Sequence, residues 1–275
     1  MVQRHQDHDR RTRERVIAEK LKPAEFPRSL SYDPEWALEN LMGPNVLRLA
    51  ESLSQVMELK PGMRVLDLGC GKAVSSIFLA KEFGVRVWAT DLWIEAGENW
   101  RRVCESGVEE LVFPIHAEAH ALPFAGGFFD AIVSLDAYHY FGTDDLYLGR
   151  HFAPLVRPGG QIGIVVPSVV HEFDDPPAHL ERFWAREWEL WSFRSPDWWR
   201  GHWAKTGLVQ VEVADLIPEG WRHWVNWDEA SLELGFVPEP FAARLPEWIE
   251  MMRKDAGRNL GFTRVVARRK AEPES

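Results

Sequence analysis

Short apolar runs alternate with amphipathic stretches between Leu59 and Pro167. The apolar run from Val65 to Leu68 predicts a buried strand that leads into a glycine turn, Gly69-Cys70-Gly71. The next stretch predicts a helix that ends at Gly84 and a second strand from Arg86 to Thr90. This βαβ pattern predicts a ligand site at the turn, because two glycines remove blocking side chains and the helix presents free N–H groups.

Two acids and one missing glycine indicate which class of ligand binds at this turn. Asp91, about twenty residues after the turn, is placed to accept hydrogen bonds from both hydroxyls of a ribose. A dinucleotide pattern has a third glycine where this chain has Val74, and no arginine cluster follows to hold a pyrophosphate. Asp67, just before the turn, repels phosphate and suits a cationic group such as an amino-acid ammonium. The pattern therefore favours a nucleoside cofactor with an ammonium group over a dinucleotide.

The order acid, Gly-x-Gly, acid resembles the class I S-adenosylmethionine-dependent methyltransferases, and three further segments occur in the family's order. They are an acid-Ala-x-x-Leu-Pro-Phe loop (Glu118 to Phe124), a fourth strand (Phe128 to Ser134) and a Pro-Gly-Gly turn (Leu155 to Gly160) into a fifth strand, Gln161 to Val166. The resemblance is close from Leu59 to Pro167. It is looser for two segments expected as edge strands, Leu208 to Asp215 and Phe262 to Arg268. It implies an α/β fold with a Rossmann-like, seven-stranded, mostly parallel sheet, an antiparallel last strand and helices on both faces.

The resemblance also implies S-adenosylmethionine as the cofactor, with S-adenosylhomocysteine as its product. The acid of the Glu118 loop is expected at the adenine, where the family usually has Asp. An aromatic residue of the helices that precede the core is expected to face the ligand, and Tyr32 and Trp36 are the candidates, with simple packing as the alternative. The expected cofactor-binding residues are Tyr32, Asp67, Gly69, Cys70, Gly71, Asp91, Leu92, Glu118, Ala119 and Ser134.

The segment from Ser134 to Tyr140 leaves the fourth strand at the end where the methyl group is expected, and it contains the candidate catalytic residues. His139 titrates near neutrality and is the candidate general base, with a purely structural histidine as the alternative. Asp136, Tyr138 and Tyr140 are candidates to orient an acceptor or an ammonium group, or alternate members point into the core. The need for a base depends on the acceptor, and transfer to O, N or C all fit the sequence.

Outside the core, tryptophan dominates. Nine of the fourteen tryptophans lie between Trp184 and Trp227, and the spacing of Trp184, Trp188 and Trp191 predicts one face of a helix. Most are expected to pack a lid onto the sheet, and two or three to line the acceptor cavity, where they would favour a flat apolar or cationic acceptor.

We expect a basic arm, flexible or helical, at 1–30 and one domain at 31–275. The domain comprises a helical cap at 31–58, broken near Gly43-Pro44, a cofactor-binding core at 59–167 and lid insertions at 168–206 and 217–260.

Composition indicates which kinds of partner and which location to expect. The net charge is −10, and because residues 1–22 hold seven Arg/Lys against four Asp/Glu, the rest carries about −13, which argues against nucleic acid as a substrate. There is no apolar run long enough to span a membrane and no signal-peptide core, so we expect a cytoplasmic location. Two cysteines suggest no disulfide framework, and no metal is expected despite the spacing of His116 and His120. The oligomeric state is open.

The function predicted from the sequence is transfer of a methyl group from S-adenosylmethionine to a small-molecule acceptor. A S-adenosylmethionine-binding protein without turnover, which recognises a partner through its tryptophans, is an alternative that keeps the fold. A nicotinamide-dependent oxidoreductase is a second alternative, which Val74 and Asp67 disfavour.

Overall fold

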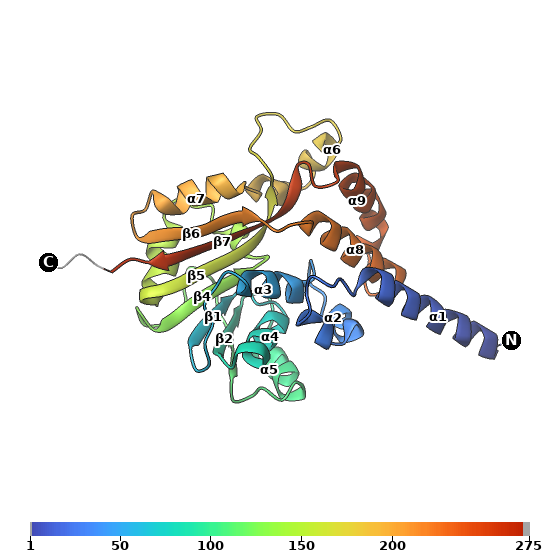
Figure 1. Ribbon diagram of the computed structural model, residues 1–275, viewed down its shortest axis with the longest axis horizontal. Helices are drawn as coiled ribbons and strands as arrows, with labels where there is room; N and C mark the ends of the chain where they lie inside the picture. Colours follow the sequence, from blue (N-terminus) through green and yellow to red (C-terminus); the bar gives the residue numbers. More distant parts are fainter. Residues whose placement is uncertain (1, 272–275) are drawn as a thin grey trace.

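Seven strands form one sheet in the order β3-β2-β1-β4-β5-β7-β6 (Figure 1). The computed structural model describes residues 2–271, and the side chains of residues 11–271. Strand β7 runs antiparallel to both its neighbours, and the pairs that join β1 to β5 are parallel, which confirms the predicted fold class. The strands are β1 (Arg64–Leu68), β2 (Arg86–Asp91), β3 (Val112–His116), β4 (Phe129–Leu135), β5 (Val156–Val169), β6 (Val209–Leu216) and β7 (Leu260–Arg269).

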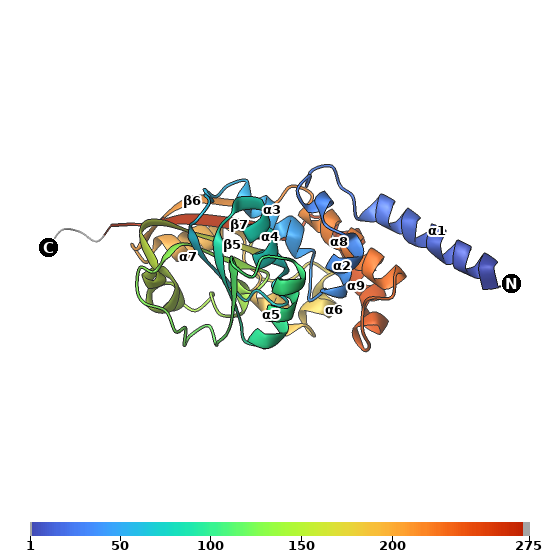
Figure 2. The same ribbon diagram turned by 90° about the horizontal axis from the view of Figure 1, so that it is seen from below.

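Helices cover both faces of the sheet (Figures 1 and 2). Helices α3, α4 and α5 cover one face, and α7 covers the other, against β6 and β7. The α-helices are α1 (Val2–Lys20), α2 (Pro34–Glu39), α3 (Val46–Ser54), α4 (Val74–Phe83), α5 (Ala96–Glu105), α6 (Glu181–Trp184), α7 (Pro196–Ala204), α8 (Gly220–Glu233) and α9 (Phe241–Asp255). Short 3-10 helices occupy Ser29–Ser31, Tyr138–Tyr140, Ala153–Leu155 and Trp188–Ser192, and a π-helix occupies Leu148–Phe152.

The first βαβ unit forms where the sequence predicts it. Strand β1 lies between β2 and β4, and its residues from Val65 to Leu68 are all buried. Helix α4 ends at Gly84, whose φ of 63° lets the chain reverse without the strain that a side chain would add there. Burial of both faces of the central strands explains their continuous apolar runs.

Two strand predictions need correction. Strand β7 is not an edge strand, because it lies between β5 and β6, and the edges are β3 and β6. Strand β5 starts at Val156 rather than Gln161. Phe129 pairs with Val156, and Ala131 pairs with Gln161, so the Pro-Gly-Gly turn forms a bulge inside the strand.

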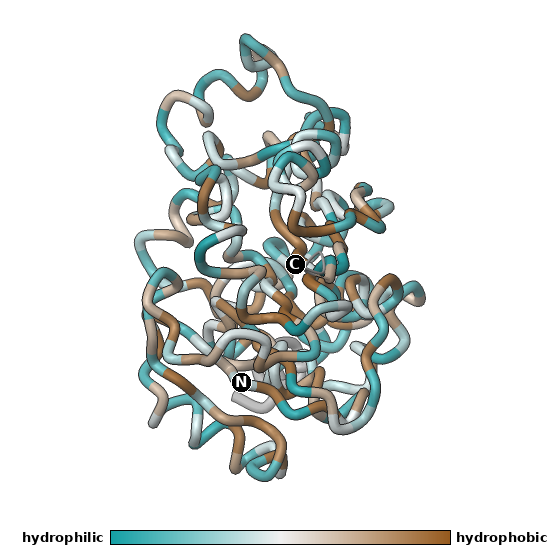
Figure 3. Tube along the Cα trace, turned by 90° about the vertical axis from the view of Figure 1, so that its left-hand side faces the viewer, coloured by the Kyte–Doolittle hydropathy of each residue, from teal (hydrophilic) through white to brown (hydrophobic). Residues whose placement is uncertain are grey.

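The predicted tryptophan helix is also wrong. Helix α6 ends at Trp184, and Trp188 and Trp191 belong to a separate 3-10 helix, with the Trp191 indole donating to the Trp184 carbonyl at 2.8 Å. On α7, Trp199 and Trp203 are fully buried in the core on their face of the sheet. That part of the segment predicted as a lid therefore covers the sheet itself. Figure 3 shows hydrophobic runs in the interior strands and a mostly hydrophilic segment beside α6.

The N-terminal segment is helical and docks at its C-terminal half. Val16 is fully buried, and the Lys20 ammonium lies 3.0 Å from Glu229 of α8. The preceding turns of α1 project from the body in both views (Figures 1 and 2). Met1, which the predicted arm includes, and residues 272–275 lie outside the described residues.

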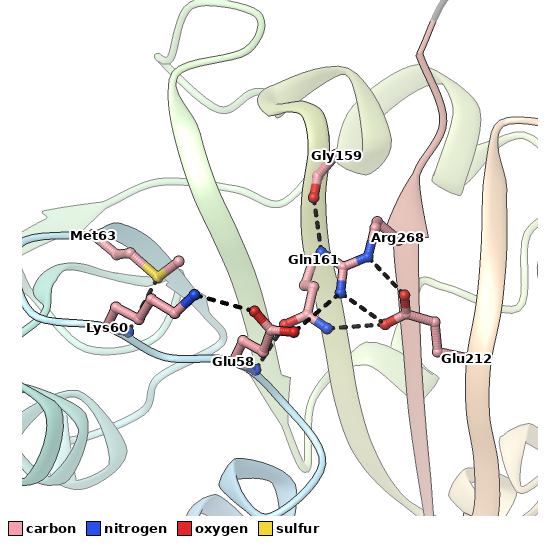
Figure 4. Close-up of polar contacts among 7 residues, drawn as sticks. All are labelled: Glu58, Lys60, Met63, Gly159, Gln161, Glu212 and Arg268. Carbon is pink, nitrogen blue, oxygen red and sulfur yellow. Dashed lines mark hydrogen bonds and ion pairs between the residues drawn. The ribbon is translucent and has the colours of Figure 1, made fainter.

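Polar side chains tie the strands together at the amino end of the parallel sheet (Figure 4). Gln161 of β5 accepts from the Glu58 backbone at 2.8 Å and donates to Glu212 of β6 at 2.9 Å. Arg268 of β7 donates to Glu212 at 2.6 Å and to the Gly159 carbonyl at 3.0 Å. The polar side chains at this end of the sheet are therefore hydrogen-bonded to one another and to the backbone.

Candidate functional site

A cavity of about 240 Å³ lies at the carboxyl ends of β1, β2, β3 and β4. Such an edge is where parallel α/β sheets bind ligands. Three groups of residues line it. The strand ends supply Leu68, Gly69, Gly71, Lys72, Val74, Asp91, Leu92, Trp93, Ala117, Glu118 and Ala119; the segment after β4 supplies Leu135, Asp136, Ala137, Tyr140 and Phe141; and helical elements supply Ala37, residues 40–46 and Trp227.

The glycine turn lies where the sequence places it. Gly69 and Gly71 have φ of 74° and 53°, and both line the cavity. A Cβ on Gly69 would lie 2.3 Å from the Ala137 Cβ, and one on Gly71 would lie 2.9 Å from the Met42 Sδ. Glycine is therefore required at residue 69 by packing as well as by conformation.

Asp91 is held rigidly at the end of β2. One carboxylate oxygen accepts from the Gly71 N–H at 2.8 Å, and the other accepts from the N–H groups of Trp93 and Ile94 at 2.7 and 3.0 Å. The side chain is 7% exposed, and that exposed part faces the cavity. A carboxylate oxygen can accept two or more hydrogen bonds, and the oxygen that binds Gly71 accepts one, so ligand hydroxyls can still be bound.

The Glu118 loop forms the next part of the wall. The Ala117 N–H donates to the Asp91 carbonyl at 3.0 Å, which ties the loop to β2. The Glu118 carboxylate turns back to His120, accepting from its backbone at 2.9 Å and contacting its Nδ1 at 2.6 Å. The hydrogen bond from His120 lowers the pKa of Glu118. The extra methylene of Glu is used for this local contact, while Glu118 and Ala119 still line the cavity.

Asp67 lies behind the turn and not on the cavity wall. It is fully buried, and its Oδ2 accepts from the hydroxyls of Ser75 and Ser76 at 2.6 and 2.7 Å. Burial raises its pKa to about 6, although these hydrogen bonds oppose the shift. Its Oδ1 has no partner among the described residues. Asp67 therefore keeps one free acceptor next to the turn.

Besides Asp67, three predicted cofactor residues do not line the cavity. The Cys70 side chain turns into the core, and burial raises the pKa of its thiol. Ser134 is buried one residue before the end of β4, where its hydroxyl donates to the Leu68 carbonyl at 2.7 Å. Tyr32 stacks on Trp36 and donates to Glu82 at 3.1 Å, so the two cap aromatics pack against α4 instead of facing the ligand.

Of the three predicted catalytic residues, Asp136 alone lines the cavity. Tyr138 is fully buried in the core among aromatic rings of the α7 side, including those of Trp199 and Trp203. His139 is 2% exposed, and its ring lies behind that of Tyr140 at 4.1 Å. Burial lowers the pKa of His139 to about 3, which is the opposite of what a base near neutrality needs.

Another part of the cavity wall is built around Asp136 and Gly43. Asp136 has a φ of 56°, and a Cβ on Gly43 would lie 2.5 Å from the Asp136 Oδ2. The Gly43 carbonyl accepts from the Trp227 indole at 2.9 Å. The loop between α2 and α3 is thus fixed from two sides, and residue 43 is a glycine because the carboxylate fills the space beside it.

The loop at 40–46, Trp93 and Ala117 were not expected at the site. The break near Gly43-Pro44 was visible in the sequence, but its position over the cavity depends on how α2 and α3 pack. Of the nine clustered tryptophans, Trp227 lines the cavity and the other eight do not, so the expectation of two or three is wrong.

Among the described residues there is no group of three or more potential metal ligands. His116 hydrogen bonds to the Leu92 carbonyl at 2.8 Å, and His120 pairs with Glu118. Within residues 2–271, no helix is long and apolar enough to cross a membrane.

Comparison with known proteins agrees with this geometry. Residues 65–160 match the family model described as a methyltransferase domain. The chain is 28% identical over 178 residues to 27-O-demethylrifamycin SV methyltransferase of Amycolatopsis mediterranei, covering 62% of each chain. The chain spans about half to three fifths of the length of the curated relatives it matches first.

Solved structures share the fold. A putative sarcosine dimethylglycine methyltransferase from Galdieria sulphuraria matches with a TM-score of 0.67 at 20% identity, over 82% of this chain and 86% of that one. The geranyl diphosphate C-methyltransferase from Streptomyces coelicolor A3(2), solved with S-adenosyl-L-homocysteine, matches with a TM-score of 0.62 at 17% identity, over 81% and 78%.

Proposed function

We propose that the chain is a class I S-adenosylmethionine-dependent methyltransferase and that it transfers a methyl group from S-adenosylmethionine to a small-molecule acceptor. The match of residues 65–160 to a methyltransferase domain and the shared fold support this proposal. The relatives named above act, by their names, on a rifamycin, on sarcosine and dimethylglycine, and on geranyl diphosphate. Their acceptors differ in chemistry and are all small molecules, which supports the class of reaction and leaves the acceptor atom open.

The residues around the glycine turn fit the cofactor. We assign Asp91 to the ribose hydroxyls, Gly69 and Gly71 to the close approach of the backbone, and the Ala117–Ala119 loop to the adenine. The unpaired Oδ1 of Asp67 is an acceptor that an ammonium group, or a water molecule bridging to it, would satisfy. Six of the ten expected cofactor residues therefore have a role in this assignment, namely Asp67, Gly69, Gly71, Asp91, Glu118 and Ala119. Leu92 lines the cavity without an assigned contact, and Cys70, Ser134 and Tyr32 do not line it.

The observation that carries the proposal is that one cavity contains both halves of a transfer site. The groups assigned to the cofactor and the groups after β4, including Asp136 and Tyr140, line the same space. A protein that only binds the cofactor needs the first half alone. The second half favours catalysis over the binding alternative.

When bound, S-adenosylmethionine supplies a methyl group activated by its positive sulfur. The chain's own contribution is to hold the acceptor in line with that methyl, about 3 Å away, and to exclude water. Asp136 is the candidate to hold or accept a proton of the acceptor, because it lies on the cavity wall and His139 does not.

Calorimetric titration of S-adenosylhomocysteine against NAD tests the cofactor assignment. We expect S-adenosylhomocysteine to bind and NAD not to. A mass-spectrometric screen for the gain of one methyl group then tests turnover on amines, phenols and indoles. Binding without any methylated product across the screen would favour the non-catalytic alternative, and NAD binding would favour the oxidoreductase.

A further inference from the structure

The carboxylate of Asp136 has no counter-ion. Burial raises its pKa to about 8, with further contributions from the negative charges of Glu189 and Asp228. Among the side chains described, no cation pairs with it. Lys72, which also lines the cavity, donates to the Glu39 carbonyl at 3.2 Å. A desolvated carboxylate without a counter-ion costs folding free energy, so its retention in a cavity indicates a ligand that supplies the positive charge.

The neighbouring acids belong to other elements of the fold. Glu189 lies on the 3-10 helix Trp188–Ser192, and Asp228 lies on α8. Burial raises the pKa of each as well. For Glu189 the negative charge of Glu187 adds to the shift and a hydrogen bond with Tyr140 opposes it. For Asp228 a hydrogen bond with Trp248 opposes the shift and the negative charge of Glu229 adds to it. Acids from two other segments therefore add to the effect of burial on Asp136.

Exposed aromatic rings lie beside the cavity, where Trp93 and Tyr140 line it and Trp188 lies next to Tyr140. The rings of Trp93 and Tyr140 are 6.2 Å apart, and those of Tyr140 and Trp188 are 6.4 Å apart. These three residues, the rim aromatics, are 70%, 40% and 63% exposed, which is unusual for side chains of this size in a cluster. Their faces attract both a cation and an apolar group.

We propose that the acceptor is an amphiphilic primary or secondary amine, whose ammonium group binds the Asp136 carboxylate and whose apolar body rests on the rim aromatics. This inference rests on the proposed methyltransferase function and adds to it the acceptor atom, nitrogen. The site is defined by the cavity and its unpaired carboxylate, and the other acids only change the pKa of that carboxylate.

The proton balance fits this assignment. An ammonium nitrogen has no lone pair, so one N–H bond must break, its electron pair staying on nitrogen and its proton passing to the Asp136 carboxylate. Burial favours this step because two charged groups become two neutral ones. The freed lone pair takes the methyl group of the cofactor as the C–S bonding pair stays on sulfur, giving a thioether and an N-methylammonium. Asp136 then releases its proton to solvent.

The test compares amines with neutral molecules of the same shape. The protein is saturated with S-adenosylhomocysteine and titrated by calorimetry with 2-phenylethylamine and tryptamine, and with the matching alcohols, 2-phenylethanol and tryptophol. We expect the amines to bind about ten- to hundredfold more tightly, the range for a charge-assisted pair. Their affinity should rise from pH 6 to pH 9 as Asp136 ionises.

Asp136→Asn keeps the shape of the side chain, and asparagine tolerates the positive φ at this position. In this variant the preference for amines should fall to within about threefold, and S-adenosylhomocysteine should bind within about twofold of wild type, the changes expected for losing one charge at the acceptor end. Glu109→Gln removes one exposed acid outside the cavity and should keep the preference. Alcohols that bind as tightly as amines, a preference that survives Asp136→Asn, or the absence of amine binding would each overturn the inference.

Its failure is distinguishable from failure of the proposed function. If S-adenosylhomocysteine binds and a phenol or a carbon acceptor gains a methyl group while no amine does, the amine inference is wrong and the methyltransferase stands. If S-adenosylhomocysteine does not bind, the proposed function is wrong, and the inference falls with it.

Discussion

The two ends of the sheet differ in whether their charged side chains are paired. At the amino end, Glu212 and Arg268 pair with each other, and Gln161 links them to the Glu58 backbone (Figure 4). At the carboxyl end, Asp67 keeps a free oxygen and Asp136 has no cationic partner among the described side chains. The same chain thus satisfies its polar groups at one end and leaves acids unpaired at the other.

The paired polar groups stabilise the fold, whereas the unpaired ones are available to bind a ligand. A paired surface charge contributes little, typically about 0–1 kcal/mol, and can be exchanged at small cost. An unpaired desolvated acid opposes folding, and a sequence keeps it where it serves a function. The predictions below test whether substitutions at the two ends have opposite consequences.

The largest effect is expected at the glycine turn. Gly71→Val should abolish measurable binding of S-adenosylhomocysteine, because a branched side chain would occupy the cavity wall beside Met42 at a φ of 53°. Gly107→Val is the matched control: its φ of 66° imposes similar strain, and nothing lies within 4 Å of its Cβ. Near-normal affinity in a folded Gly71→Val protein would place the cofactor elsewhere.

Asp91→Ala should weaken binding of S-adenosylhomocysteine by about 1.5–3 kcal/mol, the range for losing hydrogen bonds to a charged group. It also removes the acceptor of three backbone N–H groups, so circular dichroism and melting must show that the fold persists. Glu212→Gln at the other end of the sheet should leave the affinity unchanged. A change of less than about twofold in Asp91→Ala would remove Asp91 from the ribose assignment.

Asp136 and Glu212 should respond to pH with opposite signs. Because the pKa of Asp136 is about 8, above the 3.8 of an ordinary Asp, its contribution to stability is present below about pH 4 and is lost as the pH rises through 8. Partial burial acts to raise the pKa of Glu212, but hydrogen bonds from Arg268 and Gln161 lower it overall. Its contribution is therefore present above the ordinary Glu pKa and is lost as the pH falls.

Asp136→Asn should accordingly raise the melting temperature at pH 8–9 by about 2–8 °C, which corresponds to about 1–2 kcal/mol, and should change it little near pH 4. Glu212→Gln should lower it slightly at pH 7, with a difference that shrinks on acidification. Melting curves of both variants between pH 4 and 9 check this contrast. A destabilised Asp136→Asn protein at pH 9 would mean that the carboxylate has a partner.

How far the sequence predicts the structure depends on how local each signal is. The glycine turn, Asp91 and the Glu118 loop follow directly from motifs, because adjacent residues on strands and turns share one geometry. The order of the strands came with the family resemblance. Ser134 was misplaced because it lies one residue before Leu135, which lines the cavity, and a strand alternates faces at every residue. Cys70 lies in the turn between two glycines that line the cavity, and its own side chain is buried.

The acceptor end is the part that sequence could not supply. Asp136 comes beside Gly43 and within the electrostatic influence of Glu189 only after three segments, far apart in the chain, have packed together. The tryptophans show the same limit, because spacing alone does not distinguish Trp199, buried under the sheet, from Trp227 on the cavity wall. Long-range packing decides which face of a helix meets the ligand.

The smallest effect is expected at His139, which the sequence placed in the catalytic role. Its pKa, lowered by burial to about 3, keeps the ring neutral across the pH range of any assay, and His139 does not line the cavity. His139→Gln should therefore change turnover on an identified acceptor by less than about tenfold, below the usual range for a general base. The ascending limb of the pH–rate profile should persist in this variant and disappear in Asp136→Asn. The Nδ1 of His139 is buried without a partner among the described residues, so its replacement need not cost stability. Loss of the ascending limb in His139→Gln, with the melting temperature unchanged, would return the histidine to the base role and make Asp136 a binding group alone.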